Sequence, residues 1–316
     1  MKLKDFRTIL LSCVIVSTLL FSGTAYAQID EELPNPGITP DSSFYFLDIW
    51  GKKVGLFFAF GAEAKARKAL QYAEERLAEA HVMAGKNKPQ AVTVATGGYD
   101  EYMTMSVEKI GEASEEGVDI SEVSEIVALA TSKHLFVLDG VMDIVPEEAK
   151  EAIAQARGVS INGQGNALRA LAGEKPERAI EINLAAVEGR LNRARTKAEE
   201  DEFEEAENAI GEFEELYKFG EEISEIARGL GKDTTVEQLV GRATSIHLEV
   251  LGEVYEKVPE QAKPAIEKAM GVSVKGHERA VEALEEKGAL GEIPDEVRER
   301  LEELIPSILE GIPGQR

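Results

Sequence analysis

The stretch ATSKHLFVLDGV, at Ala130–Val141, returns as ATSIHLEVLGEV at Ala243–Val254. Over the longer windows 131–171 and 244–284, 22 of 41 residues are identical without a gap. Two segments this similar within one chain indicate an internal duplication, with a unit of about 110 residues. A unit of that length is long enough to bury a core of its own, so the repeat determines the architecture that we expect.

The sequence around the repeated stretch has a helical pattern almost throughout. Ala, Glu, Leu, Lys and Arg dominate from residue 62 onward, strand-like alternation is scarce, and Gly and Pro separate the periodic segments. The sequence therefore predicts an all-α fold of two tandem four-helix-bundle-like repeats. The expected helices span about 62–85, 89–116, 120–145 and 146–172 in the first repeat, 176–199, 201–229, 234–257 and 259–287 in the second, and 294–310 in a final short helix interrupted by Pro306.

The last helix of each predicted repeat carries a stripe of small residues. Steps of four and three connect seven positions, and all seven are identical between the copies. Because no bulky side chain holds the backbones apart, such a stripe predicts a close contact with a neighbouring helix. The positions are Ala149, Ile153, Ala156, Ser160, Gly163, Ala167 and Ala170, with Ala262, Ile266, Ala269, Ser273, Gly276, Ala280 and Ala283 as counterparts.

The beginning of the chain has the pattern of a secretory signal peptide. A basic head precedes the apolar run Ile9–Phe21, and Ala25-Tyr26-Ala27 is a small-x-small cleavage site. We expect cleavage after Ala27 and a secreted or extracytoplasmic protein. An uncleaved anchor is the alternative, although the apolar run is short for a membrane span. Cys13 is the only cysteine, so the remaining chain has no disulfide and no cysteine metal site.

The positions of Gly and Pro, together with changes in composition, divide the chain into five parts. We expect a signal peptide at 1–27, an extended leader with an aromatic amphipathic segment at 28–61, the first helical repeat at 62–173, the second at 174–287, and a C-terminal short helix and tail at 288–316.

The net charge limits the kinds of molecule that the protein can bind. Without the signal peptide the chain carries 32 basic and 58 acidic side chains, a net charge of −26. Such a surface repels nucleic acid and anionic lipid, and it favours solubility, cations and basic partners. We expect no nucleic-acid partner and no cofactor.

The segment Phe44–Phe60 is rich in aromatic residues and leaves two interpretations open. Leu47, Trp50, Val54, Phe57 and Phe58 fall at helical spacing, which is typical of an amphipathic helix. The helix could contact a membrane or an envelope protein from the outside, or it could cap the core of the following bundle. Only two lysines supply positive charge, so electrostatic anchoring to a membrane would be weak.

Each repeated stretch contains a histidine within an apolar stripe, His134 or His247. One hypothesis is a histidine that forms a hydrogen bond inside the bundle, with Glu74 or Glu188 as partner. The alternative is a metal site in each repeat, formed by the histidine and the carboxylate. Di-iron chemistry is not expected, because Glu-x-x-His occurs in neither repeat. His-Glu-x-x-His and Gly-x-Ser-x-Gly are also absent, which favours a non-enzymatic protein.

Three stretches resemble a known family. PGITPDSSFYFLDIWGKKVGLFFAFG, YAEERLAEA and ATSKHLFVLDGVMDIVPEEAKEAIAQA are similar to the secreted bacterial and archaeal proteins grouped as domain of unknown function 5667. The resemblance covers nearly the whole chain after the signal peptide, with the helical half present twice. It implies a helical, exported protein and no known activity. The signal peptide, the acidic surface, the duplication and the missing catalytic motifs lead us to expect binding or scaffolding at the cell envelope. Gly163–Gly165 and Pro264 depart from the family pattern and are places where the helices could be interrupted.

Overall fold

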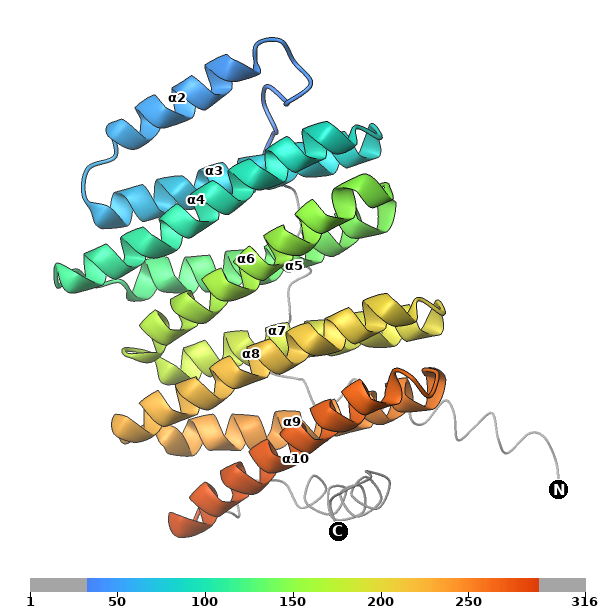
Figure 1. The fold of residues 1–316 in the computed structure, drawn as a ribbon. Coiled ribbons are helices and arrows are strands. Elements are labelled where there is room, and N and C mark those ends of the chain that lie inside the picture. The colour runs from blue at the N-terminus through green and yellow to red at the C-terminus, as the bar shows by residue number, and fades with distance from the viewer. Residues whose placement is uncertain (1–32, 290–316) are drawn as a thin grey trace, which may run out of the picture. The chain divides into compact units, whose positions relative to one another are not determined.

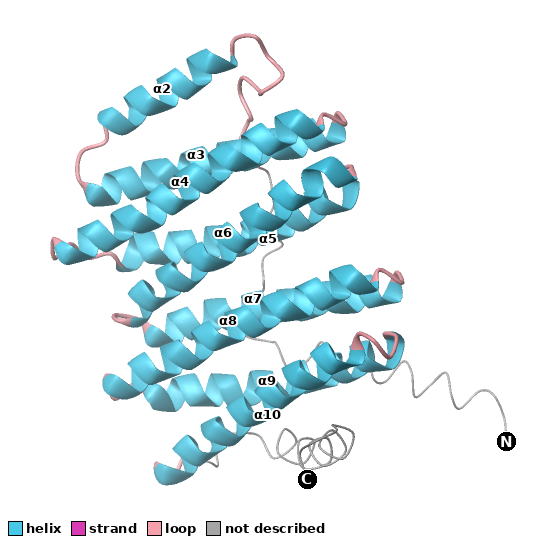
Figure 2. Ribbon diagram, in the orientation of Figure 1, coloured by secondary structure: helices cyan, strands magenta, loops and turns pink. Residues whose placement is uncertain are grey.

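The computed structural model of the chain describes residues 33–289, and these residues form nine α-helices and no strand (Figure 1 and Figure 2). The all-α prediction is therefore confirmed. The described helices belong to one compact unit that begins at Asn35. The predicted signal peptide and the predicted helix at 294–310 lie outside the described residues. The helices are α2 (Tyr45–Phe57), α3 (Ala62–Gly85), α4 (Pro89–Glu115), α5 (Ser121–Ile144), α6 (Glu147–Ala172), α7 (Pro176–Glu199), α8 (Phe203–Gly229), α9 (Asp233–Lys257) and α10 (Lys263–Glu286).

Consecutive helices pair into hairpins. Helix α3 packs on α4, α5 on α6, α7 on α8 and α9 on α10, and Figure 1 shows the hairpins following one another in chain order. Contacts of α3 with α5 and of α4 with α6 join the first two hairpins, and α7–α9 and α8–α10 contacts join the last two. Helix α6 also packs on α7 and α8, and the apolar core of the later helices includes Leu135 and Ile161. Packing thus continues across the predicted repeat boundary at 173–174.

The hairpin turns explain why the helices end where they do. Asn87, after α3, and Asp201, after α7, both adopt a left-handed backbone, with φ of 53° and 60°. The following amide in each turn donates to a carbonyl in the last turn of the helix, at 3.0 Å from Lys88 and at 2.9 Å from Glu202. This is a C-terminal cap, and it lets the chain reverse direction within a few residues.

The buried positions of the two halves correspond. Helices α4 and α8 begin 114 residues apart, and most buried positions of α4 have a buried counterpart at that distance in α8. Helices α3 and α7 also begin 114 residues apart. The duplication itself stays a prediction from the sequence. The corresponding pairs in α4 and α8 include Val92 and Ala206, Ala95 and Ala209, Tyr99 and Phe213, Tyr102 and Leu216, Met103 and Tyr217, and Ser106 and Gly220.

The small-residue stripes of α6 and α10 accommodate side chains from the preceding hairpin. A Cβ atom at Gly163 would lie 3.2 Å from the Met103 side chain, and one at Gly276 would overlap the Tyr217 hydroxyl. Helix α6 runs through Gly163–Gly165 without interruption. Helix α10 begins at Lys263 rather than at 259, because Pro264 fits only in a first turn, where no backbone donor is needed.

Candidate functional site

Helix α2 exposes most of its apolar side chains. Its large hydrophobic residues point away from the rest of the unit, and Trp50 and Phe60 are 67% and 82% exposed. Isolated exposed apolar side chains are common, but a contiguous set along one helix marks an interaction surface. We call this set the aromatic face. It consists of Phe44, Phe46, Leu47, Ile49, Trp50, Phe57, Phe58 and Phe60.

The polar side chains of α2 hold the helix on α3. Lys52 Nζ lies 2.8 Å from Asp48 and 2.7 Å from Glu75, and Asp48 also accepts a 2.8 Å ion pair from Arg76. Arg76 in turn pairs with the buried Glu79 at 2.7 Å. Burial lowers the pKa of Lys52, but the hydrogen bonds to Asp48 and Glu75 outweigh it and raise that pKa above its ordinary value. Lys52 is therefore charged, and the polar stripe of α2 faces inward.

This orientation corrects one interpretation of the sequence. The apolar stripe predicted at helical spacing could have capped the core, but four of its five residues are exposed and only Val54 is partly buried. The four exposed residues are Leu47, Trp50, Phe57 and Phe58. The physical reason is the spacing of the inward residues. Tyr45, Asp48 and Lys52 lie three and four residues apart, so one stripe can satisfy the buried charges of α3, and the opposite stripe must then face outward.

Both repeated histidines are buried and neutral. The Tyr99 hydroxyl forms a 3.1 Å hydrogen bond with His134 Nδ1, and burial lowers the pKa of His134 to about 3. His247 lies edge-on to Phe213, with 5.8 Å between ring centroids, and burial lowers its pKa to about 4. No hydrogen bond forms at His247 Nδ1, where Phe213 lacks the hydroxyl that Tyr99 supplies.

The geometry does not favour the predicted metal sites. His134 Nδ1 is bonded to Tyr99, so the prediction that Glu74 is its partner is wrong at that nitrogen. Glu74 and Glu188 are half-buried, and burial raises the pKa of each. Within residues 33–289, no group of three or more His, Cys, Asp and Glu side chains is arranged to hold a metal ion.

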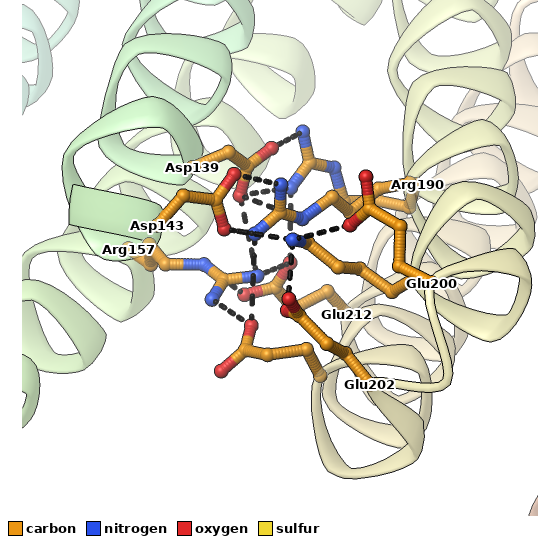
Figure 3. Close-up of polar contacts among 10 residues, drawn as sticks. Asp139, Asp143, Arg157, Arg190, Glu200, Glu202 and Glu212 are labelled. Carbon is orange, nitrogen blue, oxygen red and sulfur yellow. Dashed lines mark hydrogen bonds and ion pairs between the residues drawn. The ribbon is translucent and has the colours of Figure 1, made fainter.

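A buried network of charges joins α5 and α6 to α7 and α8 (Figure 3). Arg190 pairs with Asp139 at 2.8 Å and with Glu212 at 3.2 Å, and Arg157 pairs with the same two carboxylates at 3.3 and 2.9 Å. Every cation in the network has an acidic partner, so we assign it a structural role. Its members are Asp139, Asp143, Arg157, Arg190, Arg193, Lys197, Glu200, Glu202, Glu205 and Glu212.

Sequence analysis missed this network. Asp139 was visible as a difference between the repeated stretches, because Gly252 stands at the corresponding position. Arg190 was visible as the counterpart of Arg76. Neither observation identifies an ion pair, because the partners lie about 50 residues apart and on different helices.

These features define an all-α protein built of packed helical hairpins, with an exposed aromatic helix at its N-terminal hairpin. Residues 37–148 match the family described as domain of unknown function (DUF5667). The match includes the aromatic face and α3 to α5, and it is narrower than the resemblance expected from the sequence. Comparisons with curated proteins and with solved structures found no match. Among the described helices, none has the length and apolar character needed to cross a membrane.

Proposed function

We propose that this protein is an exported, non-enzymatic helical protein that binds at the cell envelope, and that the aromatic face of α2 contacts the membrane surface. The aromatic face is the observation that carries the proposal. Export rests on the signal-peptide pattern of residues 1–27, with cleavage after Ala27. The remaining helices would serve as a rigid, acidic scaffold that stays in the aqueous phase.

The chemistry of α2 favours a lipid surface over a protein groove as the target. Aromatic residues are enriched at the boundary between lipid headgroups and acyl chains, and an amphipathic helix lies in the plane of that boundary. The helix is held on α3 by its polar stripe, so it presents its apolar side without having to unfold. An envelope protein with a complementary apolar groove is the other possible occupant.

Binding of this kind should depend on apolar contacts and not on charge. Lys53 is the exposed cation of α2, whereas Lys52 is buried in ion pairs, and the whole chain has a net charge of −24. Screening by salt weakens electrostatic attachment to anionic lipid. We therefore expect binding to neutral phosphatidylcholine vesicles that added salt does not weaken.

Trp50 provides a direct test, because it is the only tryptophan of the chain and lies in the aromatic face. Vesicles of neutral phosphatidylcholine should shift its emission to shorter wavelength, and lipids brominated in the acyl chain should quench it. A triple variant with Phe57, Phe58 and Phe60 changed to Ser should lose most of the shift. Each side chain contributes roughly 1–2 kcal/mol when it leaves water.

The matched control is Phe136→Ser, which removes an equally exposed aromatic residue from α5. This variant should bind vesicles as the unchanged protein does. Unchanged Trp50 emission with vesicles of any lipid composition would contradict membrane binding and would leave a protein groove as the target. Equal losses in the triple variant and in the control would contradict a specific role for α2.

A further inference from the structure

Helices α7, α8, α9 and α10 line a cavity of about 170 Å³ that is partly open to solvent. Cavities of about 150 Å³ can hold a molecule the size of benzene. One wall is apolar and includes Ile180 and Val187, both from α7. The lining also has polar residues, because Asn183, Tyr217 and Glu237 border the cavity. Each of the three polar residues comes from a different helix.

The three polar side chains are between 1% and 5% exposed, and each has an atom without a hydrogen-bond partner. These atoms are Asn183 Oδ1, the Tyr217 hydroxyl and Glu237 Oε1. Buried polar atoms almost always have a partner, and an unpaired one costs about 1–3 kcal/mol. Glu237 Oε1 makes no hydrogen bond but lies 3.5 Å from an Arg228 nitrogen, so Asn183 Oδ1 and the Tyr217 hydroxyl are the two atoms without any polar partner. Two such atoms on one cavity indicate an occupant that supplies hydrogen-bond donors.

The corresponding positions of the first half cannot form this cavity wall. Ala69 corresponds to Asn183, Met103 to Tyr217 and Ser124 to Glu237. Met103 packs against Gly163 there, whereas the Tyr217 hydroxyl lies over Gly276. The polar wall is thus a property of the second half and not a consequence of the shared fold.

The charges around the cavity determine which occupant fits. Glu221, Glu225 and Glu237 line it together with Arg228 and Arg279, which leaves one excess negative charge. Arg279 is already paired with Glu221. Arg228 is mostly exposed and lies 3.5 Å from Glu237. The Glu237 atom that faces Arg228 is Oε1; this carboxylate oxygen and Asn183 Oδ1 are acceptors that cannot donate, and this arrangement disfavours an anion.

We propose that this cavity binds a small primary amine in its ammonium form. Glu237 and Asn183 accept hydrogen bonds from the ammonium group, the Tyr217 hydroxyl accepts the third, and the carbon chain contacts Ile180 and Val187. A short chain of about four carbons matches the available volume. Burial raises the pKa of Glu237 in the unliganded protein, and an ammonium group would favour its ionised form.

Isothermal titration of the full chain with n-butylamine, n-butanol and butyrate tests the proposal, because these probes share a carbon chain and differ in the head group. We expect saturable binding of n-butylamine, at least about tenfold weaker binding of n-butanol, and no binding of butyrate. Glu237→Gln should lower the affinity for n-butylamine by about tenfold or more, because it removes the negative charge while keeping the volume.

Two further variants separate the role of the site from effects on folding. Asn183→Ala introduces the residue that the first half carries at this position, so it should fold and bind n-butylamine more weakly. Ser124→Ala alters the position of the first half that corresponds to Glu237, and it should leave binding unchanged. Equal affinity for all three probes, no saturable binding, or binding that survives Glu237→Gln would overturn the proposal and leave ordered water as the occupant. Vesicle binding monitored through Trp50 is independent of this result.

Discussion

The two buried histidines differ by a single hydroxyl, and this difference allows a reciprocal prediction. Tyr99 and His134 lie edge to face with 5.4 Å between centroids, and Phe213 and His247 lie in nearly the same way at 5.8 Å. Only the first pair has a hydrogen bond, at 3.1 Å. Changing Tyr99 to Phe should destabilise the protein, and changing Phe213 to Tyr should stabilise it.

The structure sets the size of both effects. Tyr99→Phe removes one buried hydrogen bond and leaves His134 Nδ1 unpaired, which should lower the free energy of unfolding by about 1–2 kcal/mol. Phe213→Tyr should raise it by about 1 kcal/mol, because the new hydroxyl can bond to His247 Nδ1.

Urea unfolding followed by circular dichroism at about pH 7.5, where the histidines of both states are neutral, measures these changes. The control is Phe213→Tyr in a His247→Leu background, where the gain should disappear because the partner of the hydroxyl is gone. A gain that persists without His247, or a destabilising Phe213→Tyr together with a neutral Tyr99→Phe, would refute this account of the histidines.

Three other perturbations follow from the same contacts. Arg190→Ala should lower the free energy of unfolding by about 3–5 kcal/mol, because it leaves buried carboxylates unpaired. Arg195→Ala removes a partly exposed ion pair and should lower it by less than about 1 kcal/mol. Equal losses in urea unfolding would contradict this. Burial depresses the pKa of His134 and His247 below the ordinary value of 6.5, so the unfolded chain binds protons that the folded chain excludes, and stability should fall by about 2 kcal/mol per histidine between pH 6.5 and about pH 5. Urea unfolding at both pH values should show a smaller loss in a variant with both histidines changed to Gln, and an identical loss would refute the assignment. Lys52→Met should speed chymotryptic cleavage within α2, because it removes the ion pair with Glu75 that holds the helix on α3; an unchanged rate in limited proteolysis would show that this pair does not hold it.

The ends of the helices could be predicted because local residues determine them. Pro89 and Pro176 begin helices at the residues where the sequence places them, since proline needs no backbone donor in a first turn. Gly117 and Gly231 lie just beyond α4 and α8 in a left-handed conformation. Boundaries of this kind depend on a few neighbouring residues, so a single sequence contains the information.

The direction in which α2 faces could not be predicted in the same way. Hydrophobic periodicity identifies the apolar stripe of Leu47, Trp50 and Phe57, but it does not say whether that stripe faces a core or a partner. The decision rests with Asp48 and Lys52, whose counter-ions come from α3. Long-range ion pairs leave no periodic pattern, and for the same reason the network around Arg190 and the cavity wall at Glu237 were not foreseen.

One arginine–aspartate ion pair occurs at corresponding positions of two hairpins and explains how α2 is held. Arg76 of α3 and Arg190 of α7 are counterparts, and each pairs at 2.8 Å with an aspartate that follows a leucine, Asp48 on α2 and Asp139 on α5. Helix α2 thus supplies the carboxylate that pairs with the arginine of the α3–α4 hairpin, and α5 supplies the carboxylate that pairs with the arginine of the α7–α8 hairpin.

The corresponding position of α9 has no carboxylate. Gly252 stands there, and no described atom of another helix lies within 4 Å of the place where its Cβ would be. At Asp48 and at Asp139, an arginine of a neighbouring described helix is the partner. Since Asp48 must face Arg76, the remaining face of α2 can be apolar without being needed in the core. The aromatic residues of that face are therefore available to a partner outside the chain, which supports the proposal that α2 is the binding element.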